Sequence, residues 1–439
     1  MIINLNPYYQ YNTVLKNPVQ TGQKSNSSKL LPVKNGFSGA DILSVYNRVS
    51  FKGNDQVNPD LPVILEYLEE VRRNTSKIKS FANLDLDKIA NICRDIPVFS
   101  NLTAKDLKLI TTNFDSILLQ RGCVNQCSHC GVSAESKITG MRWENFTDIT
   151  DGIKTLKDRL GFNPFKSKDG DFIYPFTDSD PMIYRSRDLQ GNTHSIFDAA
   201  KYFFDQTRTK FHITTAGWNK ADKVAQAAVE NFNKYPENLD GFDISVHPFH
   251  RYMQKSLKYK QEGNIEKSEL WRNKYIDMIS NVVKNTIELK DKTKYYSIIL
   301  QYLDGKTGIE KEDSEKLLSD IFKKLHSEGV NLSYFTPYSG TYHTANVTRR
   351  SIGLIGKAAK YRASAPPELN AIDLEFNLND LKKSAKMLGP DGKILIRPDC
   401  PSGNFNGIEF MELPDIKLNF RLPTRDLSTP LKKAIIKIR

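Results

Sequence analysis

Residues 116–130 read SILLQRGCVNQCSHC, an apolar run that leads into a glycine and three closely spaced cysteines. Residues 116–120 have the length and apolar character of a buried strand. Gly122 lets the backbone turn sharply directly after that strand. The cysteines form the pattern C-x3-C-x2-C on one loop, at Cys123, Cys127 and Cys130.

The chain beyond this loop alternates between strand-like runs and segments with helical periodicity. The predicted strands are 116–120, 172–177, 211–215, 241–246, 295–302 and 331–336. The predicted helices are 146–160, 195–207, 220–234, 264–289 and 314–328. This alternation indicates parallel strands joined by right-handed crossovers, and therefore an α/β sheet or an open barrel. In such barrels the catalytic residues gather where the strands end, at their C-terminal edge.

Changes in composition divide the chain into four parts. Residues 1–60 contain no Glu and show no sustained apolar period, so we predict a mostly disordered tail there. Residues 61–113 carry helical spacing and form a helical preamble. We assign residues 114–345 to the core barrel and residues 346–439 to a smaller C-terminal extension. Within the extension we predict a helix near 378–388 and strands near 393–397 and 408–413.

The overall composition is that of a soluble globular protein, with 39% hydrophobic and 26% charged residues. No stretch reaches the roughly 18 apolar residues of a spanning helix, so we expect no membrane association. The start MIINLNPYYQYN also lacks the layout of a signal peptide. The five cysteines are poorly laid out for disulfides, which favours a reducing compartment, and we expect a cytoplasmic protein.

The three clustered cysteines favour an iron–sulfur cluster. Three thiolates on one loop can bind three irons of a cubane and leave the fourth iron open for chemistry. A zinc site could add His129 or a distant histidine, but structural zinc sites usually pair two short clips, and no second clip is present. An electron-carrying cluster would need a fourth cysteine, whereas Cys93 and Cys400 lie far away in sequence.

On these residues the chain resembles the radical S-adenosylmethionine (SAM) superfamily, over roughly residues 114–340. The resemblance implies a partial (β/α)6 TIM-like barrel of parallel strands. It further implies one [4Fe–4S] cluster on Cys123, Cys127 and Cys130, with SAM on the open iron. The implied reaction is reductive cleavage of SAM to methionine and a 5′-deoxyadenosyl radical, which abstracts hydrogen from a peptide or small molecule. Since no second cluster motif is visible, we expect an external electron donor such as flavodoxin or ferredoxin.

The same resemblance assigns cosubstrate-binding residues at the loop and at the ends of the strands. His129 occupies the usually aromatic position between the last two cysteines. The run PFTDSDPM stands where the family has a Gly-Gly-Glu-like motif; it lacks the glycines and carries shorter acids. The assigned binding residues are His129, Asp178, Ser179, Asp180, Thr215, Ser245 and Gln301. Either Asp178 or Asp180 would pair with the amino group of SAM.

Two further residues are weaker candidates for a catalytic role. His247 follows the fourth predicted strand, where an imidazole could transfer a proton. Cys400, in the run RPDCPSGNFNG, could donate a hydrogen atom or form a covalent intermediate, as in some members of the superfamily. For each, an ordinary structural role is the alternative.

Two other functions stay open. The net charge of +12 suggests a radical SAM enzyme that modifies nucleic acid, which we favour less than a peptide or small-molecule substrate. A zinc-stabilised binding protein is the alternative outside this chemistry.

Overall fold

The computed structural model describes residues 49–50, 86–111, 114–130, 134–165, 171–176, 178–302, 311–332, 335–337, 346–351, 375–376, 385–397 and 411–426. Most of the predicted N-terminal tail, residues 61–85 of the helical preamble, and Cys400 lie outside the described residues.

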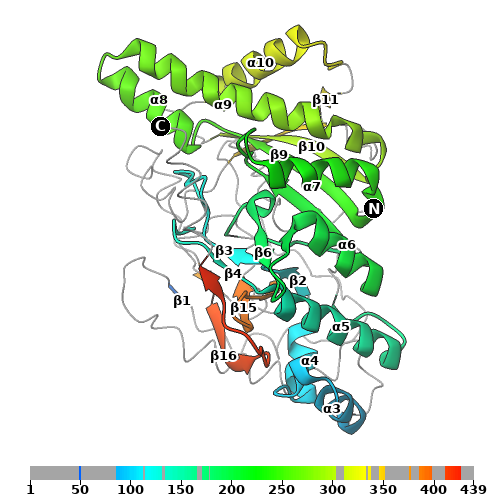
Figure 1. Cartoon of the computed structure of the whole chain (residues 1–439). Coiled ribbons are helices and arrows are strands. Elements are labelled where there is room, and N and C mark those ends of the chain that lie inside the picture. Colours follow the sequence, from blue (N-terminus) through cyan, green and yellow to red (C-terminus); the bar gives the residue numbers. More distant parts are fainter. Residues whose placement is uncertain are drawn as a thin grey trace, which may run out of the picture.

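A parallel sheet forms the centre of the described structure (Figure 1). Its hydrogen-bonded order is β11-β12-β10-β9-β8-β5, and each neighbouring pair is parallel. Beyond β5, strand β2 joins through a single parallel bridge between Ser116 and Tyr174. The strands are β2 (Phe114–Ile117), β5 (Phe172–Ile173), β8 (Lys210–Thr215), β9 (Leu239–Val246), β10 (Tyr295–Tyr302), β11 (Thr336–Pro337) and β12 (Asn346–Ser351). The predicted α/β class with a parallel sheet is confirmed. The described strands form an open sheet rather than a closed barrel.

Helices connect successive strands and form a layer along one side of the sheet (Figure 1). They are α5 (Trp143–Leu160), α6 (Ile196–Thr207), α7 (Lys223–Lys234), α8 (Arg251–Gln261), α9 (Ile265–Thr286) and α10 (Lys311–Ser327). Five of them lie where helical spacing predicts a helix. The exception is α8, which the sequence does not reveal because its only buried residue is Ser256, so no apolar stripe marks it.

The two faces of the sheet differ in chemistry because side chains alternate along each strand. The helix-covered face is apolar and joins the main core through Ile213, Phe242, Ile244, Ile298 and Leu300. The opposite face carries polar side chains at alternating positions, and these are His212, Thr214, Asp243, Ser245, Ser297 and Gln301. The candidate site lies at the C-terminal ends of these strands, next to the polar face.

The structure shortens the second predicted strand to Phe172–Ile173, and it changes the first and the sixth more deeply. The first begins at Phe114 and ends at Ile117, while Gln120 belongs to a separate short strand, β3 (Gln120–Arg121). The sixth place, beside β10, is taken by β12 rather than by residues 331–336. Strand β12 reads NVTRRS and has Val347 as its only aliphatic residue, so no apolar run marks it; backbone pairing with β10 decides its place.

Strands after residue 345 complete the core instead of standing apart from it. Besides β12, strand β14 (Ala385–Leu388) pairs in parallel with β2, and β15 (Lys393–Arg397) and β16 (Met411–Lys417) extend that sheet. The predicted helix near 378–388 is wrong at its end, since Ala385–Leu388 is a strand. Its residues are buried between β2 and β15, and this long-range pairing overrides the local spacing.

Short elements complete the two ends of the described chain. Helices α3 (Leu86–Arg94) and α4 (Ala104–Thr111) belong to the predicted preamble and pack into the main core. Strand β17 (Arg425–Asp426) pairs with β4 (Thr139–Gly140), which in turn pairs with β3. None of the helices in the described ranges is long and apolar enough to cross a membrane.

Candidate metal and cosubstrate site

The cysteine loop, residues 122–130, begins with a turn that requires glycine. Gly122 has φ +87°, in the left-handed region, and a Cβ there would lie 2.0 Å from the carbonyl oxygen of Lys137. The next backbone N–H, that of Cys123, donates to Glu135 O at 2.8 Å. The close approach of residues 135–137 to the start of the loop thus fixes the direction in which the cysteines leave the strand.

The three thiols are partly buried, and those of Cys123 and Cys130 each receive a backbone donor. Asn125 N lies 3.4 Å from Cys123 Sγ, and Ala134 N lies 3.3 Å from Cys130 Sγ. Burial raises the pKa of the Cys123 thiol to about 12, and the negative charges of Asp180 and Cys130 add to this. A thiol with so high a pKa stays protonated until a bound cation replaces the proton.

The segment after β9 holds the cysteine loop from the other side. Ser128 N donates to Phe249 O at 2.9 Å, and the side chain of Gln254 donates to Gln126 O at 3.1 Å. In addition, His250 Nε2 lies 3.3 Å from Asn125 Oδ1. Because these contacts are spread along the loop, its conformation depends on β9 and α8 as much as on its own sequence.

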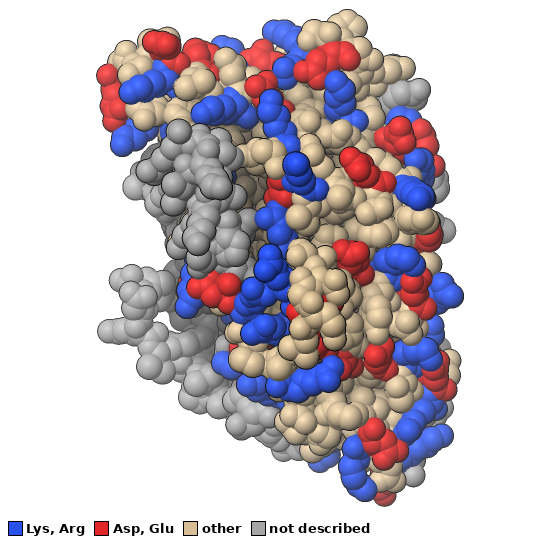
Figure 2. Space-filling view, viewed as in Figure 1, with Lys and Arg blue, Asp and Glu red and all other residues tan. Residues whose placement is uncertain are grey.

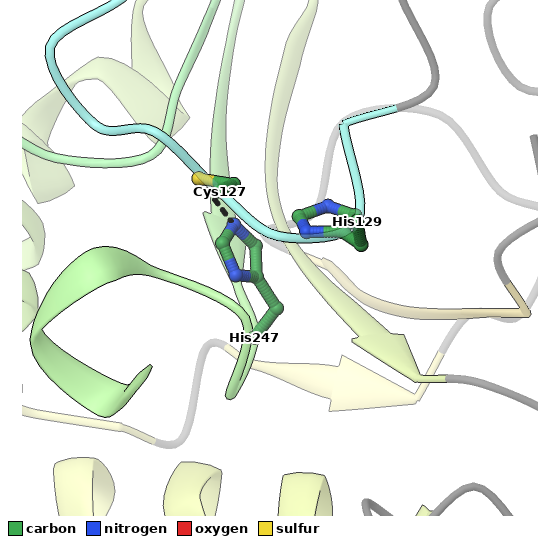
Figure 3. A group of neighbouring side chains, drawn as sticks. All are labelled: Cys127, His129 and His247. Carbon is green, nitrogen blue, oxygen red and sulfur yellow. Dashed lines mark hydrogen bonds between the residues drawn. The ribbon is translucent and has the colours of Figure 1, made fainter. Parts of the chain in front are cut away.

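Two buried histidines flank the central cysteine (Figure 3). His247 Nε2 lies 3.8 Å from Cys127 Sγ, and the rings of His129 and His247 meet edge to face with centroids 4.3 Å apart. Burial lowers the pKa of His129 to about 4, and it lowers the pKa of His247 well below its ordinary value. Both imidazoles are therefore neutral near pH 7, and each keeps a buried Nδ1 without a partner among the described residues.

Asp180 serves as an internal cross-link. Its carboxylate accepts from Asn125 Nδ2, Thr215 Oγ1 and Ala216 N, each at 2.9 Å. It also caps a 3-10 turn, Pro181–Ile183, by accepting from Met182 N at 3.1 Å. Burial raises the pKa of Asp180 to about 6, although these hydrogen bonds oppose the shift. With both oxygens occupied, Asp180 joins the cysteine loop to the end of β8.

Unlike Asp180, Asp178 and Ser179 each have a polar atom without a partner among the described residues. Asp178 Oδ2 pairs with Arg121 Nε at 2.8 Å, whereas Asp178 Oδ1 is buried and has no partner among the described residues. Ser179 Oγ is likewise buried and unpartnered within those residues. Burial raises the pKa of Asp178, and Arg121 opposes the shift. Buried polar atoms rarely stay unpaired, so this pair marks a position at which a ligand can bind.

The remaining predicted residues are distributed as follows. Thr215 is engaged by Asp180 and also accepts from Gly217 N at 3.0 Å. Gln301 Oε1 lies 2.9 Å from His129 Nε2, which ties the end of β10 to the cysteine loop. Ser245 is buried on the polar face of β9, opposite Ile299 in register.

Sequence reasoning missed three residues that shape the site. Arg121 pairs with Asp178, and Asn125 bridges Asp180 to His250. Tyr275, on α9, accepts from His247 N at 3.1 Å through its hydroxyl. Asn125 lies within the cysteine motif and Arg121 lies two residues before it, but nothing in the sequence indicates the partners that lie 55 to 125 positions away.

The donor set fits the cluster and cosubstrate that the sequence predicts. Three thiols share one loop, and the neighbouring 178–179 turn carries two buried polar atoms that have no partner among the described residues. A second grouping is also present, because ligand atoms of Cys127, His129 and His247 all lie within 4.8 Å of one another. A tetrahedral zinc ion needs ligand atoms only about 3.5 Å apart, so this trio is too wide as it stands.

No family model matches this chain, and no curated protein is significantly similar to it in sequence.

Proposed function

We propose that this chain is a radical SAM enzyme with one [4Fe–4S] cluster on Cys123, Cys127 and Cys130. The observation that carries the proposal is the three-thiol loop at the edge of a parallel sheet, beside the unpartnered Asp178 Oδ1 and Ser179 Oγ. When bound, the cluster supplies the electron that splits SAM into methionine and a 5′-deoxyadenosyl radical. The substrate is a peptide or a small molecule, and the electron comes from an external donor such as flavodoxin or ferredoxin.

In this proposal some residues of the site contact SAM, and others hold the site together. The Asp178 carboxylate takes up the SAM ammonium group through Oδ1, while Arg121 holds its other oxygen. Ser179 Oγ supplies a second polar contact. Asp180 and Thr215 keep the cysteine loop and the end of β8 together and do not contact the ligand, because their polar atoms already bond to each other.

We further propose that the sheet is the partial (β/α)6 barrel of this superfamily. The spatial order β2, β5, β8, β9, β10, β12 follows the order of these strands in the chain, as such a barrel requires. The cysteine loop follows the first of them, and the candidate ligands follow or end the second to fifth. This is the arrangement expected for a site at the C-terminal ends of barrel strands.

A mononuclear metal site is the second candidate, and one observation favours it. Cys127, His129 and His247 bring one sulfur and two neutral imidazoles together, a donor set that suits zinc. It leaves Cys123 and Cys130 without a role, which is why we rank it second.

Modification of nucleic acid gains no specific support from the face drawn in Figure 2. Lys and Arg side chains do form a run down the centre of the visible face, but Asp and Glu side chains are interspersed over the same face (Figure 2). A surface of mixed sign gives only weak electrostatic attraction to phosphates.

Anaerobic reconstitution with iron and sulfide tests the proposal. The wild-type chain is expected to bind about four irons and four sulfides, the content of one cubane, with broad visible absorption and an EPR signal on reduction. With SAM and dithionite it should then release 5′-deoxyadenosine, detected by chromatography.

Two variants sharpen this experiment. Cys127→Ala should lose the cluster and the 5′-deoxyadenosine product, whereas Cys93→Ala, which alters a cysteine buried in α3, should keep both. A colourless wild-type protein that retains one zinc per chain would refute the proposal and favour the mononuclear site.

A further inference from the structure

His247 is held so that its ring faces the sulfur of Cys127. Its backbone N–H donates to the hydroxyl of Tyr275, and its ring packs on His129 and near Phe249. Phe249 O in turn accepts from Ser128 N, directly after Cys127. Two connections between the cysteine loop and the segment after β9 thus position the imidazole and the thiol. One is the packing of His129 on His247 (Figure 3), and the other is the hydrogen bond from Ser128 N to Phe249 O.

The surroundings of the ring favour one of its two nitrogens as the position of the proton. His247 Nε2 lies 3.8 Å from Cys127 Sγ, within the range of a hydrogen bond to sulfur, whereas His247 Nδ1 is buried without a partner in the described structure. A buried N–H with no acceptor costs more than a buried nitrogen lone pair with no donor. The proton is therefore favoured on Nε2, which makes His247 a donor to the sulfur.

We propose that His247 is a positioning residue of the cysteine site, which donates a hydrogen bond from Nε2 to Cys127 Sγ and so raises the reduction potential of the bound cluster. The inference rests on the proposed function, since it assumes that Cys127 is a cluster ligand. It differs from a proton-transfer role, because the imidazole acts on the ligand sulfur and keeps its proton.

The physical basis is the charge that one-electron reduction adds to the cluster. Hydrogen bonds to the sulfurs are among the factors that set cluster potentials. An N–H donor stabilises the more negative, reduced form more than the oxidised form. Loss of this donor should therefore make the cluster harder to reduce, with its iron and sulfide content unchanged.

The test is a redox titration of the reconstituted chain, with dithionite as the one-electron donor and EPR as the readout. His247→Phe replaces the imidazole by an aromatic ring of similar shape without a donor. We expect the ratio of reduced to oxidised cluster at a fixed potential to fall about tenfold, equivalent to 59 mV for one electron. His247→Asn, whose amide is too short to reach the sulfur, should shift in the same direction and serves as a second variant if Phe disturbs folding.

Two further variants separate the hydrogen bond from general disturbance. His247→Gln places an amide donor near the former Nε2 position and should return the potential toward the wild-type value. His194→Gln alters a partly buried histidine of β7 (Thr193–Ser195) that pairs with Asp188 and stacks on Trp143 rather than facing a sulfur, and it should leave the potential unchanged.

The outcomes distinguish this inference from the function on which it rests. If the wild type binds iron and sulfide but His247→Phe and His247→Asn titrate at the wild-type potential, the inference is wrong and the proposed function stands. Equal shifts in the His247 and His194 variants would also overturn it. If the wild type binds no iron and sulfide, both fail together.

Discussion

Gly122 is the residue on which the course of the cysteine loop depends most directly. Its positive φ disfavours a side chain, and a Cβ there would overlap the carbonyl oxygen of Lys137. Asp178 and Asp180 are two similar acids that the structure distinguishes by their hydrogen-bond partners. The sequence leaves either acid as the partner of the amino group of the proposed SAM. In the described residues both oxygens of Asp180 accept hydrogen bonds, whereas one oxygen of Asp178 has no partner.

Gly122→Ala should displace the cysteine loop, because the new Cβ would overlap the carbonyl of residue 137. We expect the variant to bind less than half of the iron that the wild type takes up on reconstitution. Gly161→Ala is the matched control: Gly161 also has a positive φ, +77°, but no heavy atom lies within 4 Å of the added Cβ. It should cost only about 1 kcal/mol of unfolding free energy and leave iron binding intact. Equal iron content in the two variants would contradict the role of Gly122.

Strands β8, β9 and β10 are joined by a buried polar network on the face opposite the helices. His212 Nε2 lies 3.0 Å from Asp243 Oδ2, and its Nδ1 lies 3.4 Å from Asp240 Oδ2. Ser297, on β10, donates to the other oxygen of Asp243. Gly241 leaves the space for this ring, since a Cβ there would lie 2.6 Å from it.

This network predicts that stability depends on pH in the alkaline range. Burial lowers the pKa of His212, but Asp243 and Asp240 outweigh it and raise the pKa to about 9. A group whose pKa is higher in the folded state stabilises the fold fully below its unfolded value near 6.5, and this contribution is lost as the pH rises through about 9. Between about pH 6 and pH 10 the free energy of unfolding should fall by roughly 2 to 3 kcal/mol from this residue.

Urea unfolding at both pH values, for the wild type and His212→Gln, isolates the contribution of His212. The glutamine variant should be less stable at the lower pH and should lose less stability on going to the higher pH. A pH dependence identical in the two proteins would show that His212 is neutral in the folded state.

At the scale of the whole molecule, chain segments far apart in sequence meet around the first strand. The C-terminal strands extend the sheet from β2, and the segment before β17 is held by α5. Asn145 is fully buried there; its side chain donates to Leu422 O at 2.7 Å and accepts from Leu422 N at 3.2 Å. One side-chain amide thus pairs with both backbone groups of a residue 277 positions away.

Asn145→Ala should release this segment, because both backbone groups of Leu422 lose their partners. We expect a loss of about 1 to 3 kcal/mol in the free energy of unfolding, measured with urea. Trypsin should also cleave faster after Arg421 and Arg425. Asn233→Ala is the control. It removes one exposed hydrogen bond, from the side-chain amide of Asn233 to Asn285 O, and should have a smaller effect. If both variants behave alike, Asn145 does not hold the C-terminal segment.

The sequence by itself determined the elements whose cause is local. Helical spacing marked α5, α6, α7, α9 and α10, and apolar runs marked β8, β9 and β10, because each buries one face against its neighbours. The spacing of the cysteines after a strand and a glycine was likewise visible, since all of these residues lie within one short stretch.

Only the tertiary structure decided the features that depend on distant partners. Strand β12 carries no apolar run and β14 resembles a helix in its spacing, so backbone pairing with β10 and β2 fixes both. The same holds within the candidate site, where the state of Asp178, Asp180 and His247 depends on residues brought in by other strands and helices. Local sequence specifies which residue types can serve a site, whereas the packing of the chain decides which of their atoms are left free to do so.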